Sequence, residues 1–113
     1  MKLPSIIRVG AFDFRVEEWP SPAASAERKW GATSFTECVI RVQVVDRPPM
    51  FVLDTLIHEI NHVIFWAYQL QDGDKEERIV GVMASGWAQV YRDNPGLLEF
   101  IADAINPYSS PQA

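Results

Sequence analysis

The sequence predicts an α+β domain in which a small N-terminal β-sheet packs on about three C-terminal helices. Two observations favour this fold class. Before position 45, apolar and polar side chains alternate in short runs, which is typical of strands with one buried face. After position 48, apolar side chains recur at spacings of three and four, as in helices packed on a core. We expect one domain over 1–113, with 1–45 mostly β, 48–106 helical and 107–113 a tail.

The composition argues against several classes of function. The net charge is −5 and the ten basic residues are dispersed, so we expect neither a nucleic-acid partner nor an anionic membrane surface. A single cysteine fits a reducing compartment. The N-terminal residues lack the long apolar run of a signal peptide, and cytoplasmic localisation is therefore expected. Nothing in the composition predicts the oligomeric state.

Two extended regions are predicted in the first half. The first runs over residues 5–19 and is broken at Gly10, which suggests a hairpin or a bent strand. The second is one strand over residues 33–45, because β-branched and apolar side chains fall on one of its faces; these are Cys38, Ile40, Val42 and Val44.

Three helices are predicted in the second half. Pro48 and Pro49 end the strand region and start a helix from about Met50 to about Gln69. A second helix extends to about Arg92, with Asp74 as its expected N-cap, and Gly81 and Gly86 suggest close contact with the first. A third begins after the expected cap Asn94 and carries an apolar stripe from Leu97 to Ile105.

The first helix carries the motif H-E-x-x-H at His58, Glu59 and His62. Residues four apart lie on one face of an α-helix, so both imidazoles can converge on one ion. Glu59 is offset by one residue, where a base that activates a metal-bound water has to be. The pattern predicts a catalytic zinc ion, Zn2+, held by His58 and His62, with Glu59 as general base.

Catalytic zinc usually has a third protein ligand, and the chain has no other histidine. The acids at the start of the next helix, Glu76 and Glu77, both qualify, and the helical period does not separate them. A capping box between Asp74 and Glu77 would occupy Glu77 and favour Glu76. In addition, Asp54 lies four residues before His58 and could hydrogen-bond to its ring.

These motifs resemble those of gluzincins, and in size the chain is similar to the minimal gluzincin-like domains called minigluzincins and to metallopeptidase-like proteins of bacteria and phages. The resemblance is carried by Leu56-Ile57-His58-Glu59-Ile60-Asn61-His62 and by Glu77-Arg78-Ile79-Val80-Gly81-Val82-Met83-Ala84, and it covers about residues 33–93. It implies that Glu77 is the third zinc ligand, that the metal lies between the two helices, and that the strand before the motif runs along the substrate cleft.

The resemblance also implies hydrolysis of peptide bonds by a metal-activated water. The alternative is a catalytically degenerate metal-binding or protein-interaction module of phage or bacterial origin, because so short a chain has few walls for a substrate. A second donor for the transition state is expected among Tyr68, Tyr91 and Tyr108, and no spacing argument selects one. The sequence predicts no cleavage preference.

Overall fold

A computed structural model describes residues 2–20 and 29–106. The tail predicted for 107–113 and the tyrosine at 108 lie outside these residues. Within the described residues, four strands are followed by three helices, which confirms the α+β class. None of the described helices is both long enough and apolar enough to cross a membrane.

The four strands form one sheet with the order β1-β2-β4-β3. β1 pairs antiparallel with β2, β2 pairs parallel with β4, and β4 pairs antiparallel with β3. β3 is therefore an edge strand, next to the strand that leads into the first helix. The bounds are Ile6–Val9 for β1, Phe12–Glu18 for β2, Gly31–Ser34 for β3 and Val39–Val42 for β4.

The predicted break at Gly10 is confirmed as the turn between β1 and β2. Gly10 has a φ of 58°, in the left-handed region that a residue without a Cβ adopts most easily. On β2, Phe14 is fully buried between the exposed residues Asp13 and Arg15. The alternation predicted from the sequence therefore places one face of β2 against the core.

The single strand predicted over 33–45 is wrong, because the chain reverses there. Residues 35–38 form a turn between β3 and β4, in which Cys38 has a φ of 55°. The Ser34 Oγ accepts a hydrogen bond from the Glu37 backbone N–H at 3.1 Å and closes this turn. As a result Phe35 leaves the strand pattern and stacks on Trp66, with 5.0 Å between the ring centroids.

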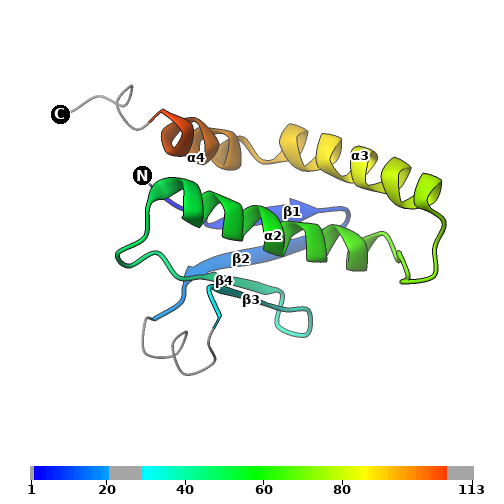
Figure 1. The fold of residues 1–113 in the computed structure, drawn as a ribbon, viewed down its shortest axis with the longest axis horizontal. Helices are drawn as coiled ribbons and strands as arrows, with labels where there is room; N and C mark the ends of the chain where they lie inside the picture. The colour runs from blue at the N-terminus through cyan, green and yellow to red at the C-terminus, as the bar shows by residue number, and fades with distance from the viewer. Residues whose placement is uncertain (1, 21–28, 107–113) are drawn as a thin grey trace.

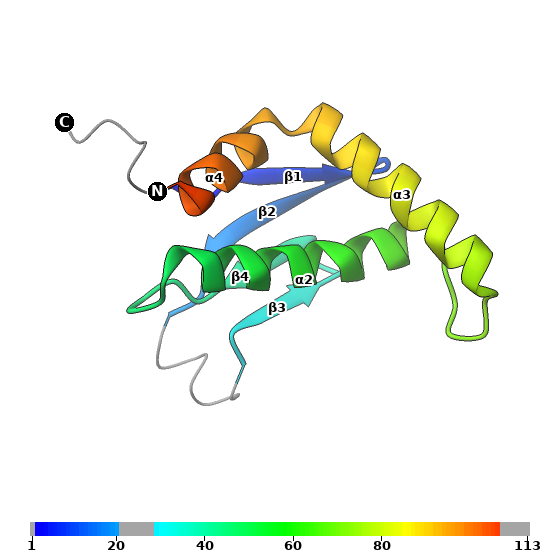
Figure 2. The same ribbon diagram turned by 45° about the horizontal axis from the view of Figure 1, so that its top comes forward.

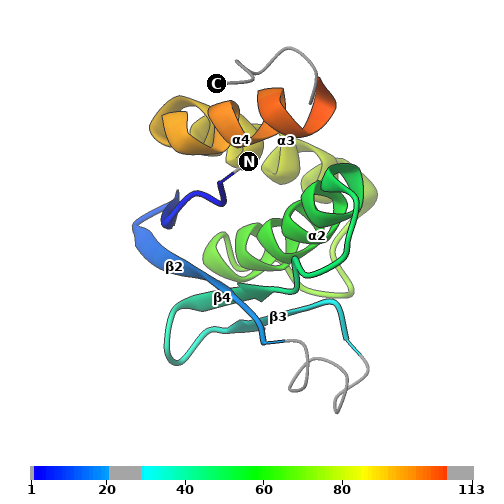
Figure 3. The same cartoon turned by 90° about the vertical axis from the view of Figure 1, so that its left-hand side faces the viewer.

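The three helices are α2 (Pro49–Ala67), α3 (Glu76–Asp93) and α4 (Pro95–Ile105). α2 and α3 agree with their predicted spans to within about two residues at each end. α2 lies along one face of the sheet. α3 and α4 lie on the same side of the sheet as α2, nearer to β1 (Figures 1 and 3). The first turns of α3 project past the C-terminal end of α2 (Figures 1 and 2).

One of the two predicted N-cap positions is wrong, and neither predicted residue makes a side-chain capping bond. Lys75 is the N-cap of α3 and makes no capping bond, while the Asp74 carboxylate accepts a hydrogen bond from the Gln71 N–H at 2.7 Å. Asn94 is the N-cap of α4, as predicted, but its side chain bonds the backbone of Arg8 in β1 and the carbonyl of Val90. The Asp74 side chain is thus engaged by the loop before α3, and the Asn94 side chain by a tertiary contact with β1.

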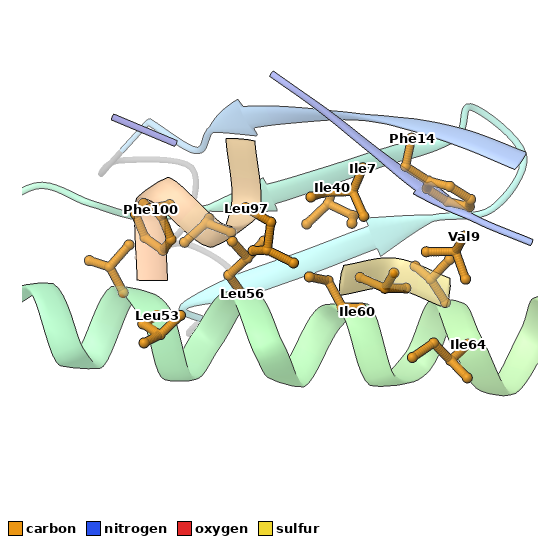
Figure 4. Close-up of a cluster of buried hydrophobic side chains, with 14 of the residues drawn as sticks. Ile7, Val9, Phe14, Ile40, Leu53, Leu56, Ile60, Ile64, Leu97 and Phe100 are labelled. Carbon is orange, nitrogen blue, oxygen red and sulfur yellow. The ribbon is translucent and has the colours of Figure 1, made fainter. Parts of the chain in front are cut away.

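The core lies between α2 and the sheet and is closed by α4 (Figure 4). Leu56, Ile60 and Ile64 follow the helical period along α2 and are fully buried. They pack in one cluster with side chains of the strands and of α4, including Ile7, Val9, Phe14, Ile40, Leu97 and Phe100. This packing fixes the rotation of α2 and hence the direction in which its polar face points.

Of the two glycines expected to contact the first helix, α2, only one does. A Cβ at Gly86 would lie 2.6 Å from the Ile64 Cγ2, so α3 approaches α2 closely there. At Gly81 a Cβ would meet nothing within 4 Å. α3 therefore packs on α2 through its second half.

Candidate metal centre

α2 brings His58 and His62 together as the motif predicts. Their Nε2 atoms are 3.2 Å apart, and the ring centroids are 4.8 Å apart at 71°. Both residues are exposed, because the core side chains occupy the opposite face of the helix. Each ring therefore presents its Nε2 atom toward the same small volume.

This nitrogen pair fits a shared metal ion. Two imidazole nitrogens bound at 2.0–2.1 Å to a tetrahedral zinc ion lie about 3.3–3.4 Å apart, close to the observed 3.2 Å between the two Nε2 atoms. A hydrogen bond between the rings, with one ring as donor, also accounts for this distance. The pair thus suits a metal in its donor type and its spacing.

Glu59 points to a different side of α2 from the histidines. Its residue surface is only 7% exposed, and its Oε1 accepts a hydrogen bond from the Thr33 Oγ1 at 2.8 Å. A buried carboxylate is costly unless polar groups satisfy it, and the hydroxyl from β3 does so. The carboxylate therefore lies in the seam between α2 and the edge strand.

A pocket of about 600 Å³ opens over these three residues. Its floor comes from α2 and its wall from β3 and the residues on either side of β3, with no contribution from α3 among the described residues. The lining residues are Lys29, Trp30, Gly31, Ala32, Thr33, Phe35, Asp54, Thr55, His58, Glu59 and His62. The structure thus places the pocket between a helix and a strand, whereas the resemblance implied a site between two helices.

Arg47 supports the outer wall of this pocket. Its guanidinium lies 4.6 Å from the ring centroid of Trp30 and donates to the Thr55 Oγ1 at 2.9 Å. Burial lowers the pKa of the Arg47 guanidinium, and the charge of nearby Asp54 acts in the opposite direction. The exposed indole of Trp30 is thereby held at the pocket mouth.

Glu77 and Glu76 are not brought to the histidine pair. Both are exposed in the first turn of α3, and neither lines the pocket. The Trp87 Nε1 donates to the Asn61 Oδ1 at 2.8 Å. Asn61 directly precedes His62, so Trp87 marks the point of α3 that lies beside the H-E-x-x-H motif of α2. Glu77 precedes Trp87 by ten residues, which is about 15 Å along a helix.

Among the described residues, no three histidine, cysteine, aspartate or glutamate side chains gather closely enough to hold a metal ion. The chain therefore assembles two of the three expected ligands, and Glu77 stays a prediction. The capping argument for Glu76 no longer holds, since Asp74 does not cap α3.

Of the other polar residues named from the sequence, Asp54 lies in the pocket, while Tyr68 and Tyr91 lie outside it. Asp54 lines the pocket, but no hydrogen bond joins it to His58. Tyr68 donates to the Gln89 Oε1 at 3.3 Å, and Tyr91 packs on Trp87. Neither tyrosine lines the pocket.

Sequence reasoning missed the wall formed by Trp30, Gly31 and Thr33. A period-two pattern can show which residues of a strand share a face, but it does not show which helix residue that face meets. The contact between Thr33 and Glu59 joins residues from two elements that only the tertiary fold brings together.

Comparisons of the chain with models of protein families, with curated proteins and with solved structures found no match.

Proposed function

We propose that this protein is a zinc-dependent metallohydrolase, with peptide bonds as its substrate class. The observation that carries the proposal is the pair of Nε2 atoms at 3.2 Å in a pocket that Glu59 also lines. His58 and His62 would hold the ion, and Glu77 is the third ligand implied by the resemblance to gluzincins. The reducing environment suggested by a single cysteine makes the cytoplasm the proposed location.

Glu59 and Thr33, which both line the pocket, have defined tasks in such a reaction. Bound zinc would polarise a substrate carbonyl and make a bound water more acidic. The Glu59 carboxylate would take the proton of the attacking water and return it to the leaving amine. The Thr33 hydroxyl holds the Oε1 atom of that carboxylate, so Glu59 faces the pocket before substrate arrives.

Peptides suit the shape of the site. β3 is an edge strand that lies beside the pocket, and an edge strand can pair its backbone groups with an extended chain. The exposed Trp30 ring at the pocket mouth adds an apolar surface for a substrate side chain. A segment lying along β3 would therefore reach the pocket that His58 and Glu59 line.

The proposal is tested by zinc analysis and by one substitution. The purified protein should contain about one zinc ion per chain, and the zinc-loaded protein should cleave fluorescein-labelled casein. Glu59→Gln keeps the size of the side chain but removes the base, so we expect zinc retention with a loss of turnover of at least about a hundredfold. The matched variant is Glu99→Gln, an exposed glutamate in α4 outside the pocket, which should behave as wild type.

The same measurements identify the alternative function. A protein that takes up zinc but cleaves no casein, and in which Glu59→Gln changes nothing, would be a metal-binding module. A protein that takes up no zinc would be a metal-free interaction domain, in which His58 and His62 bond only to each other. Either outcome would reject the hydrolase.

A further inference from the structure

The edge strand supplies a hydroxyl to the proposed catalytic base. The Thr33 Oγ1 lies 2.8 Å from the Glu59 Oε1, which is a short distance for a hydrogen bond between oxygens. The Thr33 hydroxyl is the donor, and the Glu59 carboxyl oxygen accepts.

The register of the sheet aims Thr33 at α2. Thr33 lies opposite Ile40 in the antiparallel pair of β3 and β4, and the side chains of opposite residues share one face of a sheet. Ile40 is fully buried in the core on the α2 side. A shift of one residue in this register would turn Thr33 away from the helix.

A missing side chain lets β3 approach closely enough. A Cβ at Gly31 would lie 2.7 Å from the Thr55 Cγ2 and 3.2 Å from the Glu59 Cγ. Only a glycine allows the strand to pack directly against the turn of α2 that carries Glu59. Gly31 and Thr33 therefore act together, the first by close approach and the second by its hydroxyl.

A glutamate side chain has three torsions and adopts many rotamers in solution. The bond at Oε1 selects rotamers that direct the carboxylate to the seam between α2 and β3, beside the pocket. From this geometry we infer that Thr33 is a positioning residue, which orients Glu59 for proton transfer. This inference rests on the proposed function, because it assigns Thr33 a role in the same reaction.

The test uses the full chain and compares three substitutions. Thr33→Val replaces the hydroxyl by a methyl group of similar size, and Thr33→Ser keeps the hydroxyl. Thr36→Val makes the same chemical change at an exposed residue that does not line the pocket. For each variant we would measure zinc affinity, kcat and KM on labelled casein, and the ¹³C shift of the Glu59 carboxyl carbon in the zinc-free protein.

We expect Thr33→Val to lower kcat by about 10- to 100-fold with unchanged KM and zinc affinity, the range seen when an outer partner of a metal site is removed. Its Glu59 carboxyl signal should move, while Thr33→Ser and Thr36→Val should keep both the wild-type kcat and the wild-type signal. If Thr33→Val does not fold, Thr33→Ala removes the hydroxyl without adding a methyl group and is judged by the same criteria.

Three results would overturn the inference. They are a wild-type kcat for Thr33→Val, an unchanged Glu59 signal, and a loss of zinc affinity parallel to the loss of activity, which would assign Thr33 to the folding of the site. Wild-type protein that takes up no zinc and cleaves no casein overturns the proposed function instead. The two failures are therefore distinguishable.

Discussion

At the scale of single residues, neighbouring residues of one helix differ in their exposure to solvent. His58 and Glu59 are adjacent in sequence, yet His58 is exposed and Glu59 is buried against β3. The cause is the 100° rotation between successive helical residues together with the core packing of Leu56 and Ile60. One turn of helix thus provides an accessible imidazole and a sheltered carboxylate.

The third ligand is tested by two neighbouring substitutions, Glu77→Gln and Glu76→Gln. If Glu77 binds zinc, Glu77→Gln should weaken zinc binding by at least about tenfold, because a carboxylate is a better ligand for zinc than a neutral amide. Glu76→Gln is the matched control and should bind zinc as wild type does. Isothermal titration with zinc measures both affinities.

This expectation requires the first turns of α3 to move toward the histidine pair. Few contacts hold them where they are, since Val80 is 56% exposed and a Cβ at Gly81 would meet nothing within 4 Å. If both variants bind zinc with the affinity of the wild type, neither glutamate is a ligand and α3 stays in place.

At the scale of elements, α3 is attached to the molecule through its second half. Gly86 lets it approach Ile64, and Trp87 donates to the Asn61 side chain. The Gln89 Oε1 accepts from the Gly10 N–H at 2.8 Å, which ties α3 to the turn between β1 and β2. These contacts set the level of α3 along α2 and hence the distance of its first turn from the pocket.

Two glycine substitutions in α3 test this attachment. Gly86→Ala would place a Cβ 2.6 Å from the fully buried Ile64, and overpacking of a core costs about 1–3 kcal/mol. The gain in helix propensity from glycine to alanine is about 1 kcal/mol and offsets only part of that cost. We therefore expect Gly86→Ala to lower the free energy of unfolding.

Gly81→Ala is the matched change at an open position of the same helix, and it should raise the free energy of unfolding by up to about 1 kcal/mol. Urea unfolding followed by circular dichroism measures both variants. A stabilising Gly86→Ala would mean that α3 does not pack on α2 at this point.

At the scale of the whole molecule, the pocket is made of parts that are distant in the chain. α2 forms its floor and β3 its wall, and Arg47 joins them through Trp30 and Thr55. A metal bound at His58 and His62 binds the folded chain, because unfolding separates the two rings. Zinc binding should therefore add to the stability of the whole domain.

Zinc at about a hundred times its dissociation constant should raise the free energy of unfolding by about 2.7 kcal/mol. For a chain of this size such a gain raises the melting temperature by roughly 10 °C. Differential scanning calorimetry with zinc, and again after EDTA, measures the shift. His62→Ala is the control, since it is exposed and its loss should leave the zinc-free melting temperature close to wild type. An equal zinc shift in His62→Ala would place the ion elsewhere.

The sequence by itself determined the fold class, the helices α2 and α3, the break at Gly10 and the convergence of His58 and His62. All of these depend on local periods and spacings, which one stretch of chain encodes without reference to another. The turn at 35–38 was missed because it contains neither glycine nor proline, so a continuous strand pattern hid the reversal.

Only the tertiary structure decided that Thr33 bonds to Glu59, that the Asn94 side chain bonds to β1 rather than to the first turn of α4, and that Glu77 lies about three turns from the level of the histidines. Each of these depends on how two separate elements are packed in register. Packing depends on the shapes of buried side chains throughout the core, such as Ile64 against Gly86, and no local pattern in the sequence contains that information.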